Sequence, residues 1–125
     1  METQNRAWIY TRIDAPEDAH GMLKTQEKEL MDYAENLGLT IVGGSSDLDS
    51  GMEMNRPGLA GMVKAAEQGQ FDILLVKNLS RIGRDTALVI AAIRELERHG
   101  VETLSPLEGK ISAVMLAPLS PMRLL

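Results

Sequence analysis

Short apolar runs alternate with longer amphipathic stretches along the chain, and the two patterns predict strands and helices in turn. The strand-like runs are residues 7–13 (AWIYTRI), 39–42 (LTIV), 71–76 (FDILLV) and 101–104 (VETL). Between them, apolar side chains recur at helical spacing over residues 21–37, 57–68 and 86–98. The order β-α-β-α-β-α-β predicts an α/β fold, with a mainly parallel sheet of four to five strands and helices on both faces.

Residues that favour the start or the end of a helix mark the predicted helix boundaries. Pro57 suits the first turn of the second helix, and Asp85 is placed to cap the third. Glycine follows the helical pattern at Gly38, Gly69 and Gly100. We therefore expect each helix to stop shortly before the next strand.

Two stretches lack a clear period. Residues 43–55 (GGSSDLDSGMEMN) are rich in Gly, Ser and Asp and predict a long loop. Residues 110–117 fit either a short helix or a last strand, and Pro118 and Pro121 interrupt anything longer. We accordingly predict a folded domain over residues 1–109 and a tail over residues 110–125.

Composition narrows the functional classes. The chain has 125 residues, of which 44% are hydrophobic, enough for one domain with a single core. It has no cysteine, which excludes disulfides and makes the cytoplasm the simplest location. Its two histidines, His20 and His99, are far apart in sequence, and no cofactor motif is present, so we expect neither metal nor cofactor.

Charge and hydropathy exclude two further classes. No signal peptide is recognisable, and no apolar run approaches the roughly 20 residues of a membrane span, so no membrane segment is expected. A formal net charge of −5 argues against a protein that coats DNA through net charge. A local basic site remains compatible with that charge.

The carboxyl ends of the predicted strands gather the candidate chemistry, and ligands of parallel sheets bind beyond such ends. The three loops there supply Arg12 and Asp14, then Asp47, Asp49, Ser50 and Arg56, then Lys77, Ser80, Arg81 and Arg84. Arginine binds phosphate through two parallel donors, so the set indicates a phosphate site. In a second interpretation, the aspartates neutralise the arginines as ordinary ion pairs.

Four motifs, in order and at matching spacing, favour the first interpretation. They are YTRID (10–14), LKTQEKEL (23–30), DLDSGMEMNRPGL (47–59) and LLVKNLSRIGRDT (74–86). Together they resemble the N-terminal catalytic domain of resolvase/invertase serine recombinases, from about residue 7 to residue 109. The resemblance implies the resolvase catalytic-domain fold and an enzyme of DNA recombination, of the kind that mobile elements use for excision, inversion or integration.

Members of that family cut DNA by attack of a serine hydroxyl on a phosphodiester, and they need no metal because arginines stabilise the charge. By position, the resemblance implies phosphate contacts for Arg12, Arg56, Arg81 and Arg84, and supporting places for Gln26, Asp47, Ser50, Lys77 and Ser80. The family nucleophile falls on Asp14, where no hydroxyl is available. We therefore expect impaired cleavage.

Family members also continue into a long dimerisation helix and a DNA-reading region, whereas this chain stops at Leu125. We expect weak binding of the DNA backbone by the chain alone, and association with itself or with a recombinase. One alternative is a non-catalytic protein that pairs with an active recombinase. Another is an unrelated phosphate-binding domain, suggested only by Gly43 and Gly44 after a strand.

Overall fold

The computed structural model describes residues 5–14, 21–49, 56–83 and 85–116, and at residues 14 and 49 the backbone alone. Its elements are β1 (Arg6–Asp14), α1 (Met22–Asn36), β2 (Thr40–Asp49), α2 (Pro57–Glu67), β3 (Ile73–Leu75), the 3-10 turn η2 (Leu79–Arg81), α3 (Thr86–Arg98), β4 (Glu102–Ser105), β5 (Gly109–Ile111) and α4 (Ala113–Leu116). The alternation of strands and helices confirms the predicted α/β class.

The strands form one sheet in the order β2-β1-β3-β4-β5. Neighbouring strands from β2 to β4 run parallel, and β5 returns antiparallel to β4. β1 therefore lies between β2 and β3, in the interior of the sheet. Its carboxyl end is flanked by the end of β2 and by the segment that follows β3.

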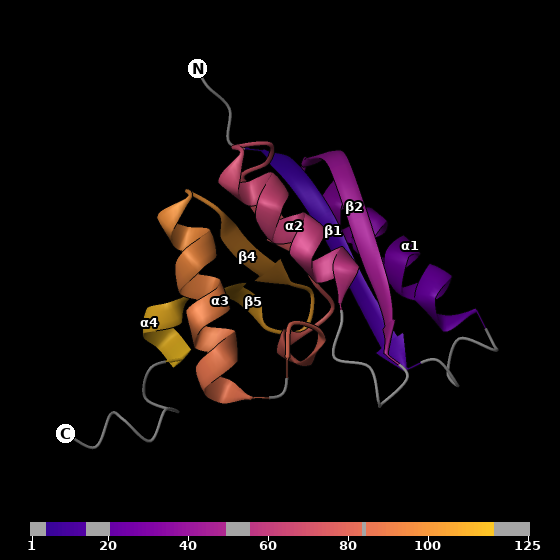
Figure 1. Ribbon diagram of the computed structural model, residues 1–125. Coiled ribbons are helices and arrows are strands. Elements are labelled where there is room, and N and C mark those ends of the chain that lie inside the picture. The colour runs from indigo at the N-terminus through magenta and orange to yellow at the C-terminus, as the bar shows by residue number, and fades with distance from the viewer. Residues whose placement is uncertain (1–4, 15–20, 50–55, 84, 117–125) are drawn as a thin grey trace.

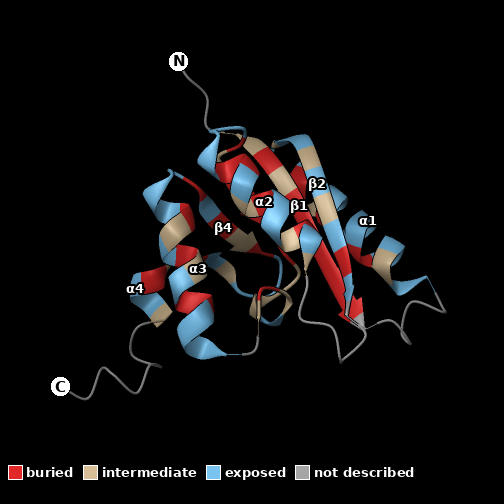
Figure 2. Ribbon diagram, in the orientation of Figure 1, coloured by how far each residue is buried: buried red, intermediate tan, exposed pale blue. Residues whose placement is uncertain are grey.

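Helices cover both faces of the sheet, as predicted: α1 lies on one face, and α2 and α3 lie on the other (Figure 1). The alternation of side chains along β1 divides the core accordingly. Ile9 packs with Leu30 of α1, whereas Tyr10 belongs to the larger cluster formed with α2 and α3. Figure 2 shows this burial as a band along the sheet and the inner helix faces.

The prediction that residues 43–55 form a loop is wrong for its first half. β2 continues to Asp49 and pairs with β1 throughout, as far as the pair Asp14 and Asp49. Gly43 and Gly44 thus lie inside a strand and form no phosphate loop. Gly43 has a packing reason, because a Cβ at this position would overlap the indole ring of Trp8. Cross-strand pairing and that stacking prevail over the low strand propensity of glycine.

The last elements show that residues 110–116 contain the end of a strand and a short helix, the two forms the sequence left open. β5 pairs with β4 and extends from Gly109 to Ile111, beyond the predicted end of the domain at residue 109. α4 begins two residues later, at Ala113. Ile111 and Ala113 are buried in the larger core cluster. The described part of this segment is therefore packed against the domain.

The predicted helix boundaries hold where the chain is described. Pro57 begins α2, and the Asp85 carboxylate accepts hydrogen bonds from the backbone N–H groups of Ala87 and Leu88 at the start of α3. Gly38 adopts a φ of 72° just after α1, a conformation that glycine tolerates best. Among the described helices, none is both long enough and apolar enough to span a membrane.

Candidate phosphate-binding site

The carboxyl end of β1 contacts the segment of residues 77–82, which we call the arginine loop because it carries Arg81. β3 ends just before it, at Leu75, and the loop itself contains η2. Asn78 shapes the loop: its side-chain oxygen accepts hydrogen bonds from the backbone N–H and the hydroxyl of Ser80. The predicted convergence of three sequence-distant segments at this edge of the sheet is present.

Arg12 points from β1 into the arginine loop. It is 4% exposed, and its guanidinium donates hydrogen bonds to the backbone oxygen of Arg81 from Nε at 3.3 Å and to that of Ser80 from Nη2 at 3.0 Å. The main chain of Arg12 is bound separately by Gln26 of α1, which accepts from the Arg12 N–H and donates to the Arg12 carbonyl oxygen. Arg12 therefore has both its backbone and its charged group fixed.

Arg56 reaches the same loop from the start of α2. Its Nη1 donates to the carbonyl oxygen of Ile82 at 2.7 Å, and its Nη2 donates to the carbonyl oxygen of Arg81 at 2.5 Å. Nη2 also donates to the Tyr10 hydroxyl at 2.7 Å. Two arginines from different elements thus share the carbonyl of Arg81 as an acceptor.

A buried polar network connects this arrangement to the start of α2. The Tyr10 hydroxyl donates to Asp47 at 2.7 Å, and Asp47 also accepts from the backbone N–H groups of Gly58 and Leu59 at 2.8 and 2.9 Å. Asp47 therefore places a negative charge at the positive end of α2, where it is favoured. Burial raises the pKa of Tyr10 well above its ordinary value, the hydrogen bond to Asp47 adds to this, and Arg56 opposes it.

These contacts show that backbone oxygens serve as acceptors for the arginines at this rim. Backbone carbonyl oxygens of residues 80–82 accept from Arg12 and Arg56, whereas Asp47 is directed to α2 and Tyr10. Two guanidinium N–H groups, Nε of Arg56 and Nε of Arg81, are buried without a hydrogen-bond partner in the described part of the chain. These two donors could bind an acceptor supplied by a ligand.

The remaining predicted residues are placed as follows. Lys77 lies at the start of the arginine loop, with its Nζ 3.8 Å from the Glu29 carboxylate, and Ser80 is exposed. Arg84, Ser50 and the side chains of Asp14 and Asp49 lie outside the described residues, so their roles in the site stay predictions.

Sequence reasoning assigned no role to Tyr10, although it quoted the residue within a motif. The signal was available, because Tyr10 precedes Arg12 by two positions and so shares its face of β1. The contacts from β4 and from the turn after it had no comparable signal. They depend on the hairpin formed by β4 and β5, which the pattern left open.

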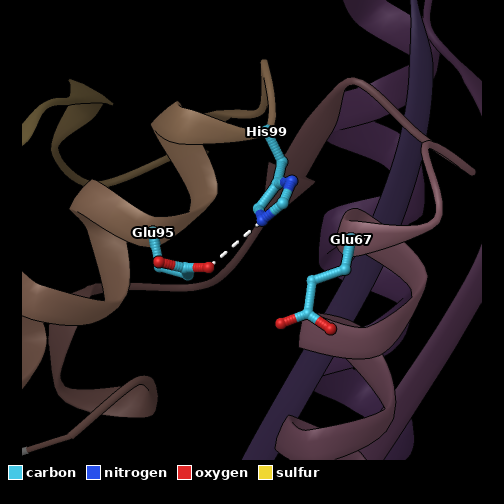
Figure 3. Close-up of side chains that lie close together, drawn as sticks. All are labelled: Glu67, Glu95 and His99. Carbon is cyan, nitrogen blue, oxygen red and sulfur yellow. Dashed lines mark hydrogen bonds and ion pairs between the residues drawn. The ribbon is translucent and has the colours of Figure 1, made fainter.

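A second polar cluster lies between the carboxyl ends of α2 and α3 (Figure 3). Ligand-type atoms of Glu67, Glu95 and His99 lie within 4.8 Å of one another, and His99 Nε2 is 3.1 Å from Glu95. Glu67 ends α2, and Glu95 and His99 are near the end of α3. Because these helices run antiparallel to the strands, the cluster is far from the arginine loop and has no part in that site.

Together, the fold and the arginine arrangement define a catalytic domain of the serine-recombinase type. The family model "Resolvase, N terminal domain" matches residues 7–113. The chain belongs to this family.

Relatives with curated descriptions agree with that assignment. A resolvase/recombinase of Pseudomonas putida is 38% identical over 96 residues, which cover 77% of this chain and 48% of the relative. The transposon Tn3 resolvase of Escherichia coli is 43% identical over 56 residues, covering 45% of this chain and 29% of the relative. The chain therefore spans half or less of the length of these relatives.

Solved structures support the same fold. The C-terminal catalytic domain of ISC1926 TnpA, an IS607-like serine recombinase, is 26% identical with a TM-score of 0.72, covering 80% of this chain and 68% of that one. A resolvase family site-specific recombinase from Streptococcus pneumoniae has a TM-score of 0.80 at 21% identity, covering 94% of this chain and 85% of that one. At that lower identity, the likeness speaks for the fold alone.

Proposed function

We propose that this chain acts in site-specific DNA recombination as a phosphodiester-binding catalytic domain whose strand cleavage is impaired. The observation that carries the proposal is the convergence of Arg12, Arg56 and Arg81 on one loop at the carboxyl end of β1. Guanidinium groups fixed in advance stabilise phosphate charge without reorganisation during reaction. This is the main requirement of phosphoryl transfer.

The unmet donors indicate where a phosphate would bind. Nε of Arg56 and Nε of Arg81 are buried and lack acceptors among the described residues, and Arg56 is bonded to the Arg81 carbonyl. A phosphate oxygen is a strong, charged acceptor for such donors. The metal-free character of the proposed chemistry follows from this use of arginine charge.

The impairment is attributed to Asp14, which ends β1 where the family places its serine nucleophile. A carboxylate has no hydroxyl to attack phosphorus. It also repels the phosphodiester, by roughly 4 kcal/mol for unit charges about 4 Å apart at an effective dielectric of about 20. Attack by the carboxylate itself would give an acyl phosphate that water hydrolyses, so it would nick DNA without rejoining it.

A covalent-adduct assay on supercoiled plasmid tests this assignment. We expect no detergent-stable protein–DNA adduct from the native chain and an adduct from Asp14→Ser. The matched control is Asp32→Ser, which makes the same exchange on the exposed surface of α1 and should leave the native result unchanged. Robust cleavage by the native chain that disappears in Asp14→Ala would overturn the impaired assignment.

Binding is tested separately with a short duplex and a salt series. Arg81→Gln should weaken binding and make its salt dependence shallower, because each neutralised phosphate contributes about 0.9 to the slope of log K against log salt. Arg98→Gln provides the control, since Arg98 is exposed and pairs with Glu95 at the far end of α3. Equal effects of the two substitutions would refute a phosphate site at the arginine loop.

A second function, pairing with an active recombinase, is favoured by the apolar surface of α3, α4 and the β4–β5 turn. Leu88, Leu107, Val114 and Met115 are 68%, 73%, 79% and 61% exposed. Exposed apolar side chains of this size gain from being covered by a partner. Val114→Glu with Met115→Glu should abolish co-elution with a full-length recombinase in size-exclusion chromatography. Unchanged co-elution would exclude this surface.

A further inference from the structure

The end of β4 and the turn that follows it make three hydrogen bonds to the segment that runs from β3 into the arginine loop. The backbone N–H of Val76 donates to the Leu104 carbonyl at 3.1 Å, and the Ser105 hydroxyl donates to the Lys77 carbonyl at 2.8 Å. The Glu108 carboxylate then accepts from the backbone N–H of Leu79 at 3.0 Å. The last contact falls on the first residue of η2, two positions before Arg81.

Ser105 holds the turn in the shape that delivers Glu108. It is fully buried, and its hydroxyl oxygen accepts from the backbone N–H groups of Leu107 and Glu108 at 3.0 and 3.1 Å while donating to Lys77. One hydroxyl therefore fixes both the hairpin turn and the start of the loop. The Glu108 backbone is anchored, so its side chain reaches Leu79 at a reduced entropic cost.

The arginine loop is thus held from two sides. Arg12 and Arg56 bind its carbonyl oxygens at residues 80–82, and Glu108 binds its N–H at Leu79. The arginines bind backbone acceptors of the loop, and Glu108 binds a backbone donor of the same loop. Without Glu108, the described contacts at the entry to η2 are the local cap from Asn78 and the bond from Ser105 to the Lys77 carbonyl.

We propose that Glu108 is a positioning residue for the arginine loop, acting on phosphate binding through the Leu79 N–H and without touching the phosphate. The inference rests on the proposed phosphate-binding function. Glu108 has two opposite effects on DNA affinity. The charge of a carboxylate near a phosphate site opposes DNA binding, whereas its hydrogen bond favours binding by holding Arg81 in place. The two effects can therefore be separated.

Two substitutions at the same position separate them. Glu108→Gln removes the charge but keeps an oxygen that accepts from Leu79, whereas Glu108→Ala removes both. We expect Glu108→Gln to bind a short DNA duplex at least as tightly as the native chain. Glu108→Ala should bind about three- to tenfold more weakly than Glu108→Gln, because the lost bond to a backbone donor frees the loop. Glu35→Ala, an exposed charge deletion on α1, is the control for net charge.

Amide hydrogen exchange at Leu79 gives a readout that does not need DNA. We expect protection in the native chain and in Glu108→Gln, and exchange about tenfold faster in Glu108→Ala, since local opening is no longer opposed by that bond. If the native chain binds no DNA while this exchange pattern holds, the proposed phosphate-binding function fails, but the role of Glu108 in holding the arginine loop at Leu79 is supported. Equal DNA affinity and equal Leu79 exchange in the two variants would overturn the inference.

Discussion

Replacing Tyr10 by phenylalanine tests the buried network that joins β1, α2 and the arginine loop. The substitution removes one oxygen atom and leaves the packed ring in place. That oxygen is fully buried, donates to Asp47 at 2.7 Å and accepts from Arg56 at 2.7 Å. Few positions offer so clean a deletion of two charge-assisted hydrogen bonds.

The expected loss of stability follows from the partners that remain. A hydrogen bond to a charged group contributes about 1.5–3 kcal/mol, so two such bonds set an upper limit of about 6 kcal/mol. Asp47 keeps two backbone N–H donors, and Arg56 keeps two carbonyl acceptors. Neither charge is left unpaired, so we expect a loss of about 2–3 kcal/mol, below that limit.

Urea unfolding followed by the fluorescence of Trp8, the only tryptophan, measures this loss. Trp8 stacks on Phe71 with ring centroids 5.3 Å apart, so its emission reports on the core. The matched control is Tyr33→Phe, because Tyr33 makes one long bond, 3.4 Å to the Ser105 carbonyl. It should cost at most about 1 kcal/mol. Equal losses in the two variants would refute the network as described.

The same variant predicts a pH dependence. Burial and Asp47 raise the pKa of Tyr10 in the folded state, so the folded chain resists deprotonation. This contribution is complete below the unfolded tyrosine pKa of about 10 and is lost as the pH rises above it toward the folded value. The stability advantage of the native chain over Tyr10→Phe should therefore shrink above about pH 10. An advantage that grows there would contradict the assignment.

Two further predictions concern backbone fit and capping. Gly58→Ala should cost about 1–3 kcal/mol in urea unfolding, because its Cβ would overlap the Ser46 carbonyl, whereas Gly61→Ala, with open space, should stabilise α2 by about 0.5–1 kcal/mol; similar effects of the two would contradict this fit. Asp85→Ala should cost about 1 kcal/mol through loss of the α3 cap, and an unchanged midpoint would contradict that role.

The sequence was sufficient to predict the α/β fold class, because the spacing of apolar residues agrees with the positions of the residues that begin and end helices. Pro57 and Asp85 begin helices where predicted, and the buried run that contains β3 lies inside the sheet. The second half of β2 was missed because Gly, Ser and Asp are typical of loops. Its pairing with β1 is decided by tertiary contacts such as Trp8 on Gly43, which local composition does not encode.

The meeting of Arg12 and Arg56 at the arginine loop could be predicted from the sequence, but the hydrogen bonds that they make there could not. Parallel topology brings Arg12, Arg56 and Arg81 together, and motif spacing identified all three. Which atoms accept from them depends on the backbone path of residues 80–82, where three carbonyl oxygens face Arg12 and Arg56. A pattern of residue types does not specify the direction of a carbonyl. For Asp47, the sequence therefore did not reveal that its carboxylate accepts from the backbone N–H groups of Gly58 and Leu59.

The carbonyl acceptors explain how like-charged arginines can be assembled before any phosphate arrives. Arginine carries five N–H donors, and Arg56 uses only Nη1 and Nη2 for its three described bonds, so that Nε stays without an acceptor. Neutral backbone oxygens offset part of the desolvation cost without cancelling the positive charge, which a carboxylate would do. In the proposed function, this local positive charge is what a phosphodiester meets, even though the chain as a whole carries a net charge of −5.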